Sequence, residues 1–549
     1  ILDNNAQVVT KTLTATGTVT FNGTINGTSA TPLENLTIAN AANAVNINAT
    51  IGLTKALSNF NINGTGQINI IGSSGNTITT GNNQNYGGAV VLTGTTNPTT
   101  TLAVTTTGAQ VKFFGTVNGT TSGVQGLTVN NIAGNPVIFA STVGASMPLL
   151  ALNLSGNATL TGNISTLNDQ SYNGTITLAA ASTLTKTSTT STINVSGTID
   201  GAYAFTISAI TLASTPAQTV TLSGSIGSTT ALTSLTITGP VQFGGTTITT
   251  TGTQTYNSAI QIANNTTFNT TNAAIIYAQL NGSTANAQGI TINNGTGTTT
   301  FNQNIGATTP LAYLISNGTG TTTLKSSSVV VAGNIDFAAP LTLAAPVSGT
   351  LISITAGNLL LATSGNQVTG GSMDLSINLS SASYLPIDGA LWTGLKSLTT
   401  SATTPVWLSG SITLNGVANS TGAIFNGVAS LMGNTTITTT SSPIRFANTV
   451  NGPYTLTVTT GSATGGSVAF VGVVGGTSPL LGLTVTGPTT LSANITTNGA
   501  QSWTGAVTLA NSIALSSTDN NISINTSLDA STVGGQSLTI NQGVGTLSV

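Results

Sequence analysis

The chain has 549 residues, of which 39% are apolar, 4% aromatic and 3% charged, and its formal net charge is −2. Seven basic residues cannot form the basic stripe that neutralises phosphates, which excludes nucleic acid as a partner. The absence of histidine and cysteine excludes the usual nucleophile, proton-shuttle and transition-metal sites, and no apolar run approaches the ~20 residues of a transmembrane helix.

The rest of the composition predicts an all-β protein. Threonine, valine and isoleucine are stiff at χ1 and pack well on a pleated surface, whereas glutamate, lysine and arginine, which favour surface helices, are scarce. Apolar residues alternate with threonine and asparagine over short runs, so a buried core is available.

The expected strands recur along the chain in a fixed order. Near the start of the chain a Leu-Thr-Ile-like strand is expected at Leu36, and a weak copy of a Pro-Leu-x-x-Leu-Thr-like strand is expected at Phe60. The next anchor is an aromatic residue that opens an alternating strand, first at Tyr86 in the run Gln84 to Val90.

These anchors then return at intervals that average about 83 residues. The aromatic anchor recurs at Tyr172, Tyr256 and Trp503, with degenerate copies at Phe337 and Phe425. The Leu-Thr-Ile-like anchor recurs at Leu127, Phe205, Ile290, Leu375, Leu456 and Leu538, and a Pro-Leu-x-x-Leu-Thr-like anchor at Leu152, Leu235, Leu314, Leu398 and Leu483.

The period predicts one continuous β-solenoid over residues 1–549, a parallel stack of coils with glycine, asparagine and serine at the corners. Each repeat is expected to hold roughly four coils of roughly 21 residues, so about 26 coils would stack into a rod on the order of 125 Å long. The approximate repeats are 1–85, 86–171, 172–255, 256–336, 337–424, 425–502 and a partial 503–549.

The solenoid interpretation also accounts for the polarity of the chain. Inward valine, isoleucine and leucine should form a continuous apolar column, while outward threonine and corner asparagine should form ladders from coil to coil. Like charges stacked at ~4.8 Å would repel, which is one reason for the scarcity of charged residues; an acidic or otherwise harsh environment is the alternative. Neither end shows a polar cap, so we expect the solenoid to continue into a longer protein or into other copies of itself.

The acidic residues offer the only candidate chemistry. A polysaccharide-cleaving β-helix enzyme or a calcium site would need clustered carboxylates, but the nine acids are scattered and corner hydrogen bonding is the favoured role. Asp374 with Asp388 and Asp519 with Asp529 are the closest pairs in sequence, and neither forms an Asp-x-Asp motif. We therefore assign no catalytic, cofactor-binding or metal-binding residue to the nine: Asp3, Glu34, Asp169, Asp200, Asp336, Asp374, Asp388, Asp519 and Asp529.

The aromatic anchors allow two interpretations. If the coils are in register, Tyr86, Tyr172, Tyr256 and Trp503 would lie on one face and could form an exposed row for carbohydrate stacking. A buried packing row is the favoured alternative, because aromatic side chains contribute most when their large apolar surface is covered.

Two runs suggest a family. Thr250 to Ile260, with sequence TTGTQTYNSAI, and Ser234 to Gly239, with sequence SLTITG, resemble repeats of filamentous haemagglutinin-like exoproteins and related autotransporter passengers. The resemblance covers nearly the whole chain and is weakest from Gly370 to Pro405. It implies a right-handed β-helix that a bacterium exports to its surface for adhesion.

Three functions follow as hypotheses. The first is a non-enzymatic extracellular shaft or stalk of a surface adhesin, which would contact a host-cell or carbohydrate receptor. The second is a self-assembling subunit of an extracellular filament or sheath, and the third is a carbohydrate-active enzyme. The missing catalytic residue types favour the first two.

Overall fold

The computed structural model describes residues 9–71, 76–132, 134–210, 219–361, 367–381, 383–416, 420–461 and 465–549. Throughout these ranges the chain forms strands, turns and bends, and no segment is a helix long and apolar enough to cross a membrane. The chain divides into two compact units, unit 1 from Ile1 to Ile275 and unit 2 from Ile276 to Val549.

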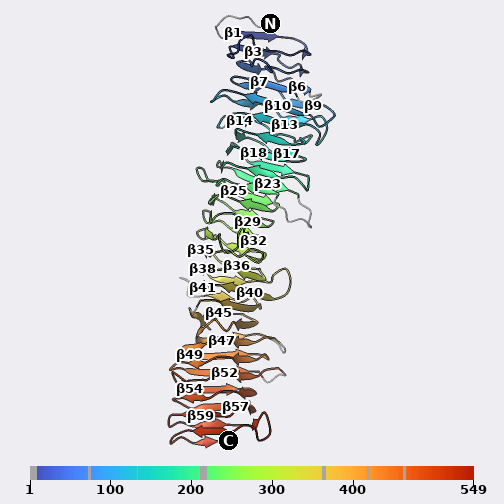
Figure 1. The fold of residues 1–549 in the computed structure, drawn as a ribbon. Coiled ribbons are helices and arrows are strands. Elements are labelled where there is room, and N and C mark those ends of the chain that lie inside the picture. The colour runs from blue at the N-terminus through green and yellow to red at the C-terminus, as the bar shows by residue number, and fades with distance from the viewer. Residues whose placement is uncertain are drawn as a thin grey trace. The chain divides into compact units, whose positions relative to one another are not determined.

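Both units are β-solenoids, and together they contain about 22 turns. Each turn contributes a strand, or at some positions a single β-bridge, to each of three sheets. Each strand pairs in parallel with the strand one turn later, as in Leu36 with Phe60 and then Phe60 with Gln84. Figure 1 shows the short strands of each unit stacked in this way. The all-β class and the parallel solenoid predicted from the sequence are confirmed.

In unit 1 we name the three sheets face A, face B and face C, in the order in which the chain visits them. Face A contains β1 (Val9–Thr14), β3 (Glu34–Ala39), β5 (Asn59–Ile62), β8 (Gln84–Tyr86), β11 (Val111–Phe113), β14 (Pro136–Phe139), β16 (Asn157–Leu160), β19 (Ile176–Leu178) and β22 (Ile199–Asp200), followed after a bridge at Ile226 by β27 (Thr247–Thr249) and β30 (Thr266–Asn269).

Face B contains β2 (Val19–Phe21), β4 (Val45–Ile47), β6 (Ile68–Ile71), β9 (Val90–Thr93) and β12 (Val117–Gly119), followed after a bridge at Val143 by β17 (Ile164–Thr166), β20 (Ser182–Lys186), β23 (Ala204–Ala209), β25 (Ser234–Thr238) and β28 (Gln254–Tyr256). Face C contains β7 (Thr77–Thr80), β10 (Thr99–Val104), β13 (Gly126–Asn130), β15 (Leu152–Leu154), β18 (Gln170–Tyr172), β21 (Ile193–Val195), β24 (Val220–Leu222), β26 (Val241–Phe243) and β29 (Ile260–Ile262).

Unit 2 begins within β31 (Ile275–Tyr277) and continues with β32 (Leu280–Gly282). One sheet holds β33 (Ile290–Asn293), β35 (Leu314–Ser316), β38 (Asn334–Phe337) and β41 (Asn358–Leu360); a second holds β34 (Thr299–Phe301), β36 (Thr322–Leu324), β39 (Leu341–Leu343), β42 (Val368–Thr369) and β45 (Trp392–Thr393). A third holds β37 (Ser328–Val330), β40 (Leu351–Ala356), β43 (Asp374–Leu379), β46 (Ser397–Thr400), β48 (Ala423–Phe425), β50 (Ile444–Phe446), β53 (Val468–Phe470), β55 (Thr489–Leu491), β58 (Val507–Leu509) and β61 (Leu528–Ala530).

The later turns of unit 2 add two more sheets. The larger holds β44 (Leu385–Asp388), β47 (Val406–Leu414), β49 (Ala429–Thr439), β52 (Thr455–Thr460), β54 (Gly482–Thr486), β57 (Gln501–Thr504), β60 (Ile522–Ile524) and β63 (Leu547–Ser548), with β51 (Val450–Asn451) beside β49. The smaller holds β56 (Ile495–Thr497), β59 (Ile513–Ser517) and β62 (Leu538–Asn541).

The turns differ in length, and this corrects both the expected coil of near-constant size and the expected number of coils. Ala158 pairs with Ile176 across a short turn, whereas Phe205 pairs with Leu235 across a much longer one. Short turns have tight corners, and long turns carry loops between the same three strand positions. The average turn is therefore longer than expected, and the chain forms about 22 turns and not about 26.

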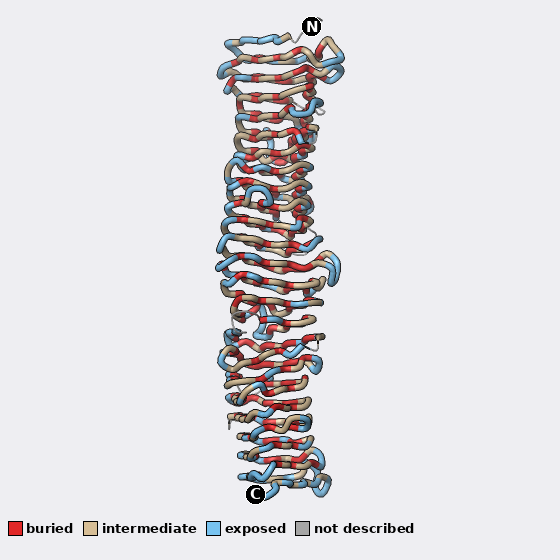
Figure 2. Tube along the Cα trace, turned by 90° about the vertical axis from the view of Figure 1, so that its left-hand side faces the viewer, coloured by how far each residue is buried: buried red, intermediate tan, exposed pale blue. Residues whose placement is uncertain are grey.

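The core of each unit is a stack of inward side chains. Figure 2 shows buried positions along the strands and exposed ones at corners and loops. On face A, Tyr86 stacks on Phe113 and Phe113 on Phe139, with ring centroids 5.1 and 5.2 Å apart. In unit 2, Phe446 stacks on Phe470 at 5.4 Å. Such spacing follows from parallel strands about 4.8 Å apart, so each ring lies over the ring of the previous turn.

Outward asparagine side chains form ladders from turn to turn, and these lie on the strands as well as at the corners where asparagine ladders were expected. The Asn59 side-chain amide donates to Asn35 Oδ1 at 2.7 Å, and that of Asn85 donates to Asn61 Oδ1 at 2.8 Å. Each pair joins residues that are paired between adjacent turns of face A. Uncharged amides satisfy one another in such a column without the repulsion that charged groups would suffer.

Candidate functional site

Three of the acidic residues hydrogen-bond across a corner to the next turn, which is the role that the sequence favoured. The Asp169 carboxylate accepts from Thr192 N at 2.7 Å, that of Asp200 from Thr229 N at 2.8 Å, and that of Asp519 from Val544 N at 3.1 Å. Each acceptor belongs to one turn and each donor to the next. Within the described ranges no three His, Cys, Asp or Glu residues are grouped as a metal ion would require, and Asp3 lies outside those ranges.

The first of the two pairs that lie closest in sequence, Asp374 and Asp388, does not share a sheet. Asp374 begins β43 and Asp388 ends β44, which belong to different sheets of unit 2. Asp388 Oδ1 accepts from Ala390 N at 2.9 Å, while Asp374 takes part in a separate cluster. Asp529 lies exposed on β61.

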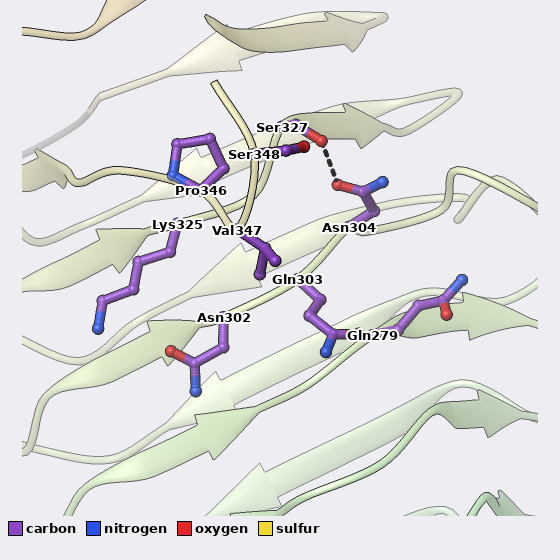
Figure 3. A pocket seen from close by; sticks show the side chains of 9 residues that line it. All are labelled: Gln279, Asn302, Gln303, Asn304, Lys325, Ser327, Pro346, Val347 and Ser348. Atoms are coloured by element: carbon purple, nitrogen blue, oxygen red, sulfur yellow. Dashed lines mark hydrogen bonds between the residues drawn. The ribbon is translucent and has the colours of Figure 1, made fainter. Parts of the chain in front are cut away.

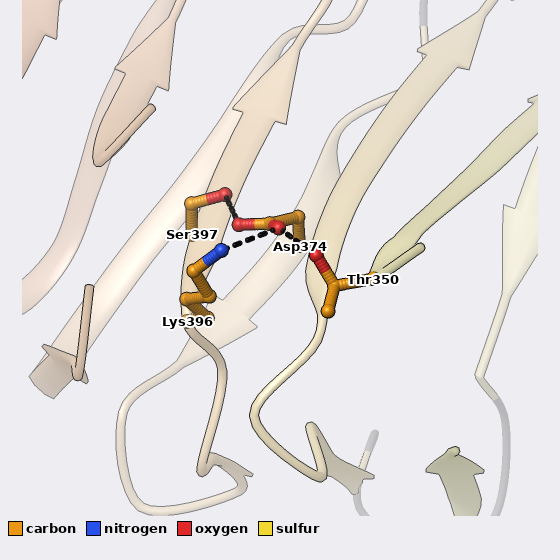
Figure 4. Close-up of polar contacts among 4 residues, drawn as sticks. All are labelled: Thr350, Asp374, Lys396 and Ser397. Carbon is orange, nitrogen blue, oxygen red and sulfur yellow. Dashed lines mark hydrogen bonds and ion pairs between the residues drawn. The ribbon is translucent and has the colours of Figure 1, made fainter. Parts of the chain in front are cut away.

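The Asp374 cluster joins three successive turns of unit 2 (Figure 4). Its carboxylate accepts from Ser397 Oγ at 2.6 Å and Thr350 Oγ1 at 2.6 Å, and it forms an ion pair with Lys396 Nζ at 3.1 Å. Burial by itself would raise the pKa of Asp374, but these hydrogen bonds and the nearby ammonium outweigh burial and lower it. Because both carboxylate oxygens of Asp374 are engaged, the cluster links adjacent turns and does not provide a free general base.

The aromatic anchors are buried, so the exposed-row interpretation is wrong. Tyr86, Tyr172 and Tyr256 are at most 1% exposed, as is Trp503. They also do not share a face, because β8 belongs to face A, β18 to face C and β28 to face B. The alternative interpretation, in which the four anchors are buried packing residues, is confirmed.

Each buried tyrosine belongs to a hydrogen-bonded group that we name the corner clip: a threonine, a glutamine four residues later and a tyrosine two residues after that. In the first copy, Tyr86 Oη donates to Gln84 Oε1 at 2.9 Å, and Gln84 Nε2 donates to Thr80 Oγ1 at 3.2 Å and to the Ala103 carbonyl of the next turn at 2.8 Å. The clip recurs at Thr166, Gln170 and Tyr172 and at Thr250, Gln254 and Tyr256, with the same tyrosine–glutamine distance of 2.9 Å.

A degenerate copy shows how the clip is replaced. The threonine of each clip forms a parallel β-bridge to a leucine of the preceding corner; these threonines are Thr80, Thr166, Thr250 and Thr497. Val331 forms the equivalent β-bridge to Leu311. Four and six residues after Val331 stand Ile335 and Phe337, both buried. All three polar members are thus apolar here, consistent with the rule that replacing both hydrogen-bond partners costs far less than leaving one buried and unpaired.

The last copy breaks this rule. Trp503 stands where the other copies have tyrosine, and neither its Nε1 nor Gln501 Oε1 has a partner. Gln501 Nε2 still donates to Thr497 Oγ1 at 3.3 Å and to the Ser516 carbonyl at 2.8 Å. The clip therefore explains why the anchors recur, although nothing in its geometry makes it reactive.

Unit 2 contains an open hollow of about 270 Å³ (Figure 3). Pro346 and Val347 overhang one side, and the floor is polar, with Asn302, Gln303 and Lys325 from consecutive turns. Ser327 Oγ donates to Asn304 Oδ1 at 2.9 Å at its edge. The hollow contains no acid, so its residues cannot carry out the carboxylate chemistry of a glycosidase.

One exposed aromatic pair was not predicted from the sequence. Tyr384, just before β44, and Trp407, on β47, have ring centroids 5.2 Å apart and ring planes 18° apart. Tyr384 is 38% exposed and Trp407 41% exposed. Both lie in or next to the segment from Gly370 to Pro405, where the sequence departs most from the repeat, and that departure was the available signal.

The resemblance to filamentous haemagglutinin-like exoproteins rests on repeat patterns alone, and family membership stays a prediction. No protein-family model matches the chain, and no curated protein or solved structure does so either.

Proposed function

We propose that the chain is a structural and adhesive shaft at a bacterial cell surface. The observation that carries this proposal is the pairing of successive turns, in which hydrogen bonds and apolar side chains both connect one turn to the next. Such a structure lengthens by adding turns, and each turn contacts only its neighbours. A fold of this kind is suited to spanning distance and presenting outward side chains.

The distribution of polar groups supports a structural function over an enzymatic one. Asp169, Asp200 and Asp519 hydrogen-bond corners, and Asp374 is engaged by Lys396 and two hydroxyl groups. Glycoside cleavage needs two carboxyl groups about 5–9.5 Å apart across a substrate cleft. We propose that the chain is not an enzyme, and a polysaccharide panel from which it releases no product would agree.

Imaging and attachment test this proposal together. Negative-stain electron microscopy of the purified full chain should show isolated rod-like particles, and beads coated with the chain should be retained on cultured-cell monolayers under flow. Compact globular particles would contradict the shaft, and continuous fibres that lengthen with protein concentration would favour the filament hypothesis. Coated beads that wash off as readily as uncoated beads would contradict the adhesive function.

A further inference from the structure

We propose that Tyr384 and Trp407 form a binding platform for a neutral oligosaccharide. This inference rests on the proposed adhesive function and deepens it by naming a ligand class and a site. Tyr384 and Trp407 contrast with the other two tryptophans of the chain and with the tyrosines of the three clips.

The contrast is one of burial. Trp392 and Trp503 are at most 2% exposed, and the tyrosines of the three clips are at most 1% exposed, whereas Trp407 is 41% exposed. The flanking residues Val406 and Leu408 are fully buried, so Trp407 occupies an outward position of a regular strand. Most outward strand positions in this chain hold threonine, serine or asparagine, which suit a solvated sheet face, so an exposed indole at such a position is an exception.

Register explains how the platform is built. Trp407 lies between Pro386 of the preceding turn and Ser430 of the following turn, and all three positions face outward. The small Ser430 side chain leaves the indole prominent on that side, while the Tyr384 ring supports it at 5.2 Å. Rings held in this way have few torsions left to restrict, so little conformational entropy is lost when a ligand binds.

The same sheet face supplies hydrogen-bonding groups. Asp388 and Ser409 are paired across adjacent turns, two residues further along their strands than Pro386 and Trp407. Asp388 accepts one backbone N–H through Oδ1, and a carboxylate has further acceptor sites on both oxygens. Apolar ring faces next to a carboxylate and hydroxyl groups match a pyranose, which has an apolar C–H face and a rim of hydroxyl donors and acceptors.

Charge selects a neutral sugar. The strands that form this face, β44, β47 and β49, contain no lysine or arginine, and Asp388 is their one charged residue. A uronic acid or sialic acid would meet a like charge there without a compensating cation. A neutral glycan would meet no such penalty, and the open face could accept a chain of sugars.

The experiment titrates the full chain with two neutral probes, cellohexaose and mannohexaose, and one acidic probe, an oligogalacturonate of similar length. At least one neutral probe should bind and should change the tryptophan emission, because Trp407 is exposed while Trp392 and Trp503 are buried. Trp407→Thr and Tyr384→Thr should each weaken binding at least tenfold, since tryptophan and tyrosine dominate binding hot spots. Tyr203→Thr is the matched control, because Tyr203 is 42% exposed in unit 1 and should not affect binding.

Asp388→Asn provides a second test that leaves both rings in place, because an asparagine Oδ1 can still accept from Ala390 N. It should weaken neutral binding and reduce discrimination against the oligogalacturonate. The proposal is overturned if no neutral probe binds, if Trp407→Thr binds like the unmodified chain, or if the acidic probe binds more tightly. These outcomes leave the electron-microscopy test untouched, so the platform and the shaft can fail separately.

Discussion

At the scale of single residues, the corner clip shows what a buried polar group requires in this fold. Gln84, Gln170 and Gln254 are fully buried, and each has its amide oxygen paired to a tyrosine hydroxyl. The aromatic anchor is evident in the sequence because it recurs, but the hydrogen bonds of its glutamine to the threonine four residues earlier and to a carbonyl one turn later are visible only in three dimensions.

The clip predicts an unequal response to substitution. Tyr256→Phe leaves Gln254 Oε1 without its tyrosine donor, and an unpaired buried acceptor costs about 1–3 kcal/mol. The triple change Thr250→Val, Gln254→Ile and Tyr256→Phe copies Val331, Ile335 and Phe337 and should cost less than the single change. Hydrogen exchange of the β28 amides measures both, and a triple variant that opens more readily than Tyr256→Phe would contradict the account.

Asp374 predicts a pH dependence. A carboxyl group with a folded-state pKa below its unfolded value stabilises fully above the unfolded pKa of about 3.9, and that stability is lost as pH falls through the folded pKa. Asp374→Asn should therefore lower the free energy of unfolding at pH 7 by about 1.5–3 kcal/mol, the contribution of a hydrogen bond to a charged group, and so lower Tm; this deficit should shrink below about pH 4. Circular dichroism from pH 7 to pH 2 measures this, with exposed Asp529→Asn as control; a deficit that grows in acid would refute it.

At the scale of elements, the corner that begins with a left-handed glycine recurs in both units. Gly52, Gly144, Gly227, Gly306 and Gly475 all have φ between 62° and 71°, and each precedes by five residues the leucine that bridges to the next turn. A Cβ at any of them would lie against a carbonyl oxygen of the next turn, far inside contact distance. The corner is therefore fixed by close approach as well as by backbone conformation.

Two glycines of unit 1 allow the effect of close approach to be distinguished from the effect of left-handed backbone conformation. Gly144 has φ of 69° and would place a Cβ against the Ser165 carbonyl, whereas Gly134 has φ of 89° and open space around it. Gly134→Ala should cost only the about 1–2 kcal/mol of left-handed strain, and Gly144→Ala should cost more because adjacent turns must also separate. Thermal unfolding and exchange of the β17 amides compare the two, and equal costs would show that the contact does not matter.

At the scale of the whole molecule, the sequence predicted the parallel stack, the inward columns and the corner acids, because period-two alternation and corner residues act locally. The sequence could not predict how many turns make up one repeat, because the period is counted in residues and the turns vary in length. The turn that joins Ala158 to Ile176 is short, and the turn that joins Phe205 to Leu235 is long. The exposed Trp407 was missed for a related reason: alternation shows that a residue points outward without showing which outward residue binds a ligand.

The structure relates the aromatic anchors by strand positions. Ten strands and the bridge at Val143 lead from β8 to β18, and ten strands and the bridge at Ile226 lead from β18 to β28. At three positions per turn, eleven positions make three and two-thirds turns, close to the roughly four coils expected for each repeat. Because this number is not whole, each anchor lies on a different face from the one before. Phe337, Phe425 and Trp503 likewise lie in three different sheets of unit 2. Equivalent residues of successive repeats therefore do not form one column.

This relation predicts that a large deletion is tolerated better than a small one. Removing residues 86–171 joins Asn85 to Tyr172, so that Gln84 again has a tyrosine two residues later and its clip is restored. The deletion removes eleven strand positions. β18 can then take the place of β8 on face A, with an equivalent sequence around it. Removing only residues 86–130 leaves Gln84 without a tyrosine and places unlike corners above one another. The first variant should keep the circular dichroism per residue and a cooperative unfolding transition, and the second should lose Tm by several degrees or more. If the larger deletion is the more damaging, position along the chain rather than the repeat governs which strands can stack.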